Sequence, residues 1–133
     1  MCNQGLFSDN EIFRNDVAGV DVETQGHPTM RKSHMHHCPV GVWVHDNGGG
    51  VFDGNTIVHM AYSGVTVETG GAPQMTGNHV THSKGQGVLC QKHGQGVFHG
   101  NELRQNALAG VEITSSANPK WTENTICEGK DAG

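Results

Sequence analysis

Apolar and polar positions repeat along this chain with a period of 22 to 23 residues. In one column of the repeat asparagine recurs, with Ser33 in place of one asparagine, and an aliphatic residue follows two positions later. In a second column glycine precedes an apolar-x-apolar pair such as Val20 and Val22. Because the columns stay in register over the whole chain, the repeat is structural. The polar column is Asn10, Ser33, Asn55, Asn78, Asn101 and Asn124; the glycine column is Gly19, Gly41, Gly64, Gly87 and Gly110; and a third column of large apolar residues is Phe7, Met30, Phe52, Met75, Phe98 and Trp121.

The repeat predicts short β-strands joined by turns. Apolar-x-apolar spacing has the period of a strand, no segment keeps a helical periodicity, and Gly, Pro and Asn separate the apolar pairs. One coil per repeat places equivalent strands about 4.8 Å apart in a stack. We therefore predict an all-β, single-stranded right-handed parallel β-helix of about six coils, forming one domain over residues 1–133. A β-propeller would need about 40 residues per blade, and a leucine-rich repeat would need Leu at fixed positions.

Two columns have specific roles in this prediction. The asparagines are expected to form an internal ladder, in which each side-chain amide bonds to neighbouring coils and to turn backbone that would otherwise be buried unpaired. The column glycines are expected to supply a left-handed or otherwise sharp backbone at the corner before each strand. The expected ladder residues are Asn10, Asn55, Asn78, Asn101 and Asn124.

Composition narrows the class of protein. Only 34% of the residues are apolar and 20 are glycine, which suits a thin core spread along an axis. The net charge is −5 without long blocks of one sign, so we expect neither nucleic acid nor a membrane as partner. The first residues lack a basic region before an apolar run, and the four cysteines show no CxxC pairing. We expect reduced thiols and a cytoplasmic or nuclear protein, and leave open that the chain is a piece of a longer one.

Histidine is the unusual residue, with ten copies. The positions four after the polar column include His37, His59 and His82, which the repeat stacks on consecutive coils about 4.8 Å apart. A divalent metal could bridge two of these imidazoles. We favour the alternative that this is an exposed polar column, and so expect no metal site and no cofactor.

Acidic residues on the outer face raise the question of catalysis. Glu23, His45 and Glu68 follow equivalent strands, so the two acids should lie about 9–10 Å apart across the coil between them. Inverting glycosidases use a separation of about that size. No long insertion interrupts the repeats, however, and such loops usually build the groove that encloses a sugar chain. We therefore expect a protein that is not an enzyme.

Apolar residues on the same face suggest a binding surface. Trp43 and Leu89 are expected to point outward, with Tyr62 at a turn, as a strip for a peptide or a sugar ring. Scattered surface residues are the alternative. Cys90 replaces valine in an inward column and should be a buried, inert thiol. The candidate binding residues are Trp43, His45, Glu23, Glu68 and Leu89.

Several segments resemble a known repeat. They are GLFSDNEIFRN at 5–15, AGVDV at 18–22, NGGGVF at 47–52 and AGVEI at 109–113, with Asn118 and Pro119 before Trp121. Over nearly the whole chain they are similar to the carbohydrate-binding-and-sugar-hydrolase-type repeats of the F-box only protein eleven family. The resemblance implies a right-handed parallel β-helix that recruits substrate proteins to a cullin-based ubiquitin ligase. The family's F-box helices and zinc-binding domain have no counterpart in this sequence.

The function expected from the sequence is a non-catalytic binding module for a protein partner. The alternative is a β-helix protein that binds or cleaves a polysaccharide, because loosely similar repeats occur in polysaccharide-active enzymes and in periplasmic copper-maturation factors. A third expectation is end-to-end self-association through strand edges at the two ends of the stack.

Overall fold

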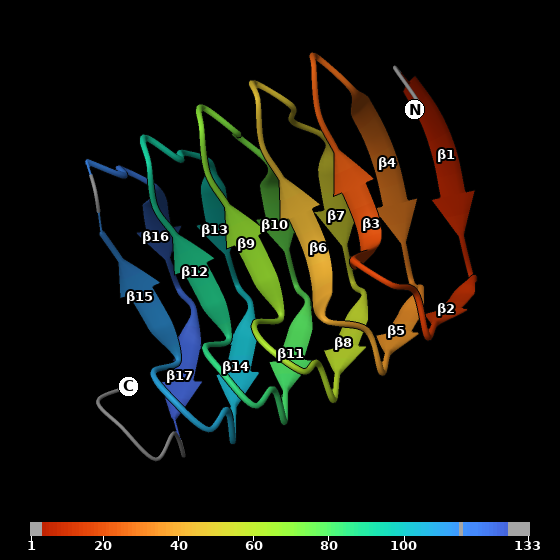
Figure 1. Cartoon of the computed structure of the whole chain (residues 1–133), viewed down its shortest axis with the longest axis vertical. Coiled ribbons are helices and arrows are strands. Elements are labelled where there is room, and N and C mark those ends of the chain that lie inside the picture. The colour runs from red at the N-terminus through yellow and green to blue at the C-terminus, as the bar shows by residue number, and fades with distance from the viewer. Residues whose placement is uncertain (1–3, 115, 128–133) are drawn as a thin grey trace.

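The computed structural model describes residues 4–114 and 116–127, which form seventeen short strands in three parallel sheets (Figure 1). The first sheet contains β1 (Gln4–Ser8), β4 (His27–Arg31), β7 (Val51–Asp53), β10 (Gln74–Thr76), β13 (Val97–His99) and β16 (Lys120–Thr122). The second contains β2 (Glu11–Phe13), β5 (His34–His36), β8 (Thr56–Val58), β11 (His79–Thr81), β14 (Glu102–Arg104) and β17 (Thr125–Cys127). The third contains β3 (Ala18–Val22), β6 (Val40–Val44), β9 (Val65–Val67), β12 (Val88–Cys90) and β15 (Val111–Ile113). None of these described segments is helical, so none of them is a helix that could cross a membrane.

The chain winds through the three sheets in turn, and this confirms the predicted all-β parallel solenoid. Each coil adds one strand to each sheet, and Figure 1 shows the coils stacked in sequence order from β1 to β17. The expected count of about six coils is slightly high, because the described residues make five complete coils and two strands of a sixth. The register follows the repeat: Phe52 pairs with Met30 on one side and with Met75 on the other.

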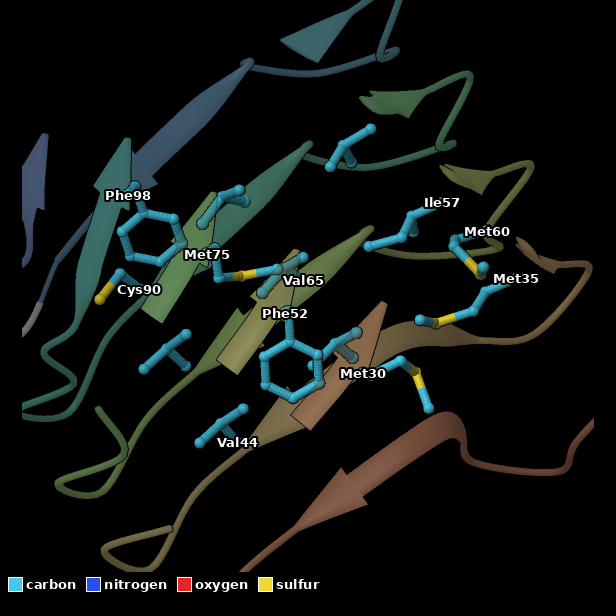
Figure 2. Packing of buried hydrophobic residues seen from close by; sticks show 14 of the residues in the cluster. Met30, Met35, Val44, Phe52, Ile57, Met60, Val65, Met75, Cys90 and Phe98 are labelled. Carbon is cyan, nitrogen blue, oxygen red and sulfur yellow. The ribbon is translucent and has the colours of Figure 1, made fainter. Parts of the chain in front are cut away.

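A thin apolar core fills the interior. Phe52 and Phe98 are almost completely buried, and the valines of the third sheet, such as Val42 and Val65, stack on one another. Figure 2 shows Phe52, Phe98, Val65 and several methionines pointing into the space between the sheets. Cys90 is fully buried among them, as its place in a valine column predicts, and this burial raises the pKa of its thiol to about 11.

The asparagine ladder runs along the turns that join the first sheet to the second. Asn78 Nδ2 donates to Asn101 Oδ1 at 2.9 Å and to the carbonyl of Phe52 at 2.9 Å, and the same pattern recurs at Asn55 and Asn101. The ladder therefore satisfies buried turn backbone, as expected. Asn10 departs from the prediction. It is exposed and joins the column through its backbone N–H, which donates to Ser33 Oγ.

The column glycines are needed for a different reason from the predicted one. Positive φ angles among the glycines occur elsewhere, for example at Gly50, and not at Gly41 or Gly64. A Cβ on Gly41 would lie 2.5 Å from the carbonyl oxygen of Gly64 and 2.5 Å from Cγ2 of Ile57. Close approach of successive coils excludes a side chain there, whereas residues such as Arg14 and His59 adopt the left-handed turns.

Candidate functional site

The outward face of the third sheet carries the site. Trp43 on β6 pairs with Thr66 on β9, and Thr66 pairs with Leu89 on β12, so these three side chains form one column across neighbouring coils. Thr66 is 8% exposed, and its hydroxyl lies 2.5 Å from that of Ser63, so it forms the floor of the face rather than an outward contact. A shallow depression of about 500 Å³ follows this column. We call it the lateral groove; its principal lining residues are Val17, Trp43, Tyr62, Glu68, Leu89 and Gln91.

Hydrogen bonds hold the indole of Trp43 in place. Nε1 of Trp43 donates to Glu68 Oε2 at 3.0 Å, and Gln91 Nε2 donates to Glu68 Oε1 at 2.9 Å. Lys92 Nζ lies 4.0 Å from the same Oε1 atom. Both carboxylate oxygens of Glu68 are therefore engaged, and this carboxylate connects the second, third and fourth coils.

His45 lies at the edge of the groove between two carboxylates. Its Nε2 is 2.7 Å from Asp21 Oδ1 and its Nδ1 is 2.8 Å from Asp46 Oδ2, while its ring stacks on Trp43 with centroids 4.0 Å apart. Burial, the largest single influence, lowers the pKa of His45, but the hydrogen bonds and charges of Asp21 and Asp46 together raise it above its ordinary value. Trp43, His45 and the surrounding carboxylates thus form one connected cluster.

The structure brings most of the sequence-predicted surface together. Trp43, Glu68 and Leu89 line the groove, His45 packs against Trp43, and Glu23 lies beside His45 on the preceding coil. Sequence reasoning missed Asp16 and Gln86, which also line the groove. Gln86 immediately precedes a column glycine, so the repeat register is the signal that could have placed it on this face.

The histidine column forms a separate feature on another edge. The rings of His37 and His59 have centroids 5.5 Å apart, and those of His59 and His82 are 5.2 Å apart, close to the expected spacing. His36 Nδ1 lies 2.7 Å from His37 Nδ1. Burial, and then the charges of His82, His37 and His36, lower the pKa of His59.

Metal-ligand geometry differs between the two features. The rings of His37 and His59 stack at an interplanar angle of 25°, with their centroids 5.5 Å apart. In the described part of the chain, the three ligand atoms that lie within 4.8 Å of one another belong instead to Glu23, His45 and Asp46.

The fold and its columns define the class of protein: a parallel β-helix with a solvent-exposed lateral groove. Comparison with known families matches residues 2–126 to the right-handed β-helix region, so the chain belongs to that family. No solved structure matches it. The match supports the β-helix and does not extend to the F-box only protein eleven family.

Proposed function

We propose that this chain is a non-catalytic binding module that holds an extended segment of a partner protein in the lateral groove. The observation that carries the proposal is the exposed apolar strip across neighbouring coils. Tyr62 and Val17 are 67% and 55% exposed at the groove, next to the indole of Trp43 and the side chain of Leu89. Exposed aromatic and aliphatic side chains in one depression are typical of protein interaction sites.

Charge around the groove indicates the chemistry of the partner. Asp16 and Glu68 line it, and Asp21 and Asp46 flank His45 at its edge. Among the described residues, Lys92 is the cation paired with a groove carboxylate, with Nζ 4.0 Å from Glu68 Oε1. The net charge of −5 has the same sign. A segment with Lys or Arg beside apolar side chains complements this surface.

The finer form of the proposal comes from the resemblance described above. A β-helix of the F-box only protein eleven type would present such a groove to a ubiquitin-ligase substrate. The similar strings at 5–15 and 109–113 support this form, and co-purification of a cullin complex with the intact gene product tests it.

A polysaccharide ligand is the second candidate, and the Trp43–Glu68 pair favours it. A flat indole beside a carboxylate and the Gln91 amide offers stacking and hydrogen bonding to a sugar ring. We propose binding without cleavage in this case as well, because both oxygens of Glu68 already accept hydrogen bonds.

Two arrays test the proposal. The purified protein is applied to an array of 12-residue peptides that combine Lys or Arg with Leu, Phe or Val, and to a glycan array that includes pectin and alginate fragments. We expect peptide binding that Trp43→Ala and Leu89→Ser each weaken about tenfold or more, the loss typical of a central interface residue. Val97→Ser is the matched control, because Val97 is 42% exposed on β13 of another sheet.

Three other outcomes would each contradict part of the proposal. Binding to glycans alone, lost in Trp43→Ala, would establish the second candidate. Release of reducing ends or unsaturated products from pectin or alginate, lost in Glu68→Gln, would show that the module is an enzyme. Peptide binding that is equal in Trp43→Ala, Leu89→Ser and Val97→Ser would show that the groove is not the site.

A further inference from the structure

Glu23, His45 and Asp46 converge on the turns that follow β3 and β6. One ligand atom of each residue lies within 4.8 Å of the ligand atoms of the other two. Backbone hydrogen bonds fix the two turns to each other, because His45 N donates to the Val22 carbonyl at 3.0 Å and Thr24 N donates to the Asp46 carbonyl at 3.0 Å. The three side chains are therefore held by the rigid stacking of two coils.

His45 has the environment of a metal-binding imidazole. Its side chain is only 10% exposed, and Asp21 holds Nε2 at 2.7 Å. Histidine ligands usually bond their second nitrogen to a carboxylate in this way, which fixes the tautomer and orients the ring. The other nitrogen, Nδ1, then faces Asp46 at 2.8 Å.

Charge in this cluster is unbalanced. The carboxylates of Glu23, Asp21 and Asp46 surround one imidazole, and in the described part of the chain the Glu23 carboxylate has no hydrogen-bond or ion-pair partner. His45 must be neutral to bind an ion, so the three carboxylates carry three negative charges, of which a divalent cation would neutralise two. The equivalent positions two coils later are Gln91 and Lys92, so the combination is specific to the first two coils.

We propose that Glu23, His45 Nδ1 and Asp46 bind a first-row divalent cation, with Zn²⁺ as the best match. An imidazole ligand favours such ions over Mg²⁺ and Ca²⁺, and three protein ligands leave one position of a tetrahedral ion for water or another ligand. Asp21 is the positioning residue, because it acts on the ion through His45. The inference does not depend on what the lateral groove binds.

The stacking of Trp43 on His45 provides a direct readout. In a Trp121→Phe background Trp43 is the remaining tryptophan, and its fluorescence is followed while metal-free protein is titrated with Zn²⁺, Co²⁺, Mg²⁺ or Ca²⁺. Bound Co²⁺ quenches the fluorescence of a nearby tryptophan. Its visible absorption spectrum also reports the geometry of its ligands. We expect one Zn²⁺ per chain, Co²⁺ quenching, and at least tenfold weaker affinity in Glu23→Gln and in His45→Gln. Asp21→Asn should lower affinity about tenfold, as outer carboxylates do.

The exposed histidine column is the competing site, so His59→Asn is the matched control and should bind Zn²⁺ as the parent does. The proposal is overturned if Zn²⁺ binding is lost in His59→Asn and kept in Glu23→Gln. It is also overturned if the fluorescence of Trp43 does not respond up to about 1 mM Zn²⁺, a dissociation constant that corresponds to a binding free energy of about −4 kcal/mol. Urea unfolding of each metal-free variant checks its fold. Glu23→Gln is decisive if His45→Gln fails to fold, because the Glu23 carboxylate has no partner among the described residues.

Discussion

Asn78 Nδ2 donates to Asn101 Oδ1 at 2.9 Å, in the interior of the solenoid and across two neighbouring coils. The same Oδ1 accepts the backbone N–H of Asn78 at 2.9 Å. One side chain thus satisfies two donors of the preceding coil, and the ladder links the coils more specifically than sheet bonds alone.

Replacing Asn78 with Ala should lower the free energy of unfolding by about 3 kcal/mol or more. The substitution removes four buried hydrogen bonds, which join the Asn78 side chain to the Phe52 carbonyl, to the backbone N–H and Nδ2 of Asn55, and to Asn101 Oδ1, and each such bond contributes about 0.5–1.5 kcal/mol. Urea unfolding measures the change. Asn10→Ala, at the exposed position of the same column, is the control and should change stability by about 0.5 kcal/mol or less. Equal effects at the two positions would contradict the role of the ladder.

Gly41→Ala should destabilise the protein through a steric clash. The new Cβ would lie 2.5 Å from the Gly64 carbonyl oxygen, which belongs to the rigid backbone of the next coil, so the coils must separate. We expect a loss of about 3 kcal/mol or more, at the upper end of overpacking costs. The comparison is Gly100→Ala, where φ is +66° and nothing lies within 4 Å, so that only the left-handed cost of about 1–2 kcal/mol applies. Thermal melting that ranks the two variants in the opposite order would reject this explanation.

The His59 column should make stability fall in mild acid. Because the pKa of His59 is lowered in the folded protein, the unfolded chain takes up its proton first. The contribution of neutral His59 to the free energy of unfolding is complete above its pKa in the unfolded chain, near 6.5. It is lost as the pH falls from there through the pKa of His59 in the folded protein. Urea midpoints between about pH 8 and pH 5 should therefore decline less in His59→Asn than in the parent, since Asn tolerates the left-handed turn without a charge. Parallel curves would show that the column has no such effect.

Cys90 should be unreactive in the native protein. Its burial and raised pKa of about 11 leave almost no thiolate at about pH 8. In a Cys2→Ser, Cys38→Ser, Cys127→Ser background we expect no reaction with dithionitrobenzoate until denaturant is added. The matched protein that keeps Cys127 in place of Cys90 should react at once, because Cys127 is partly exposed. Rapid native labelling of Cys90 would mean that the coils open easily at this position.

The features of the fold that could be predicted from the sequence are those that the repeat register determines. Columns such as Met30, Phe52 and Met75 follow from a period near 23, because parallel stacking places equivalent residues over one another. The same register placed Trp43 and Leu89 on one face and His37, His59 and His82 on one edge.

Features that depend on contacts between columns were not predictable. Thr66 is buried and its hydroxyl contacts that of Ser63, and the role of Gly41 arises from the distance of closest approach between coils. The enclosure of His45 by Asp21 and Asp46 depends on side-chain rotamers across two coils. Periodicity fixes which residues are neighbours, but not which of their atoms meet.

Register between coils has an evolutionary consequence. Each coil provides the same backbone frame, and each of its strands pairs with the equivalent strand of the coil on either side. Exposed residues such as those around His45 can therefore change without altering the inward columns. A duplicated pair of coils would keep the inward columns that stabilise the fold, while its outward residues could change and provide a new binding specificity.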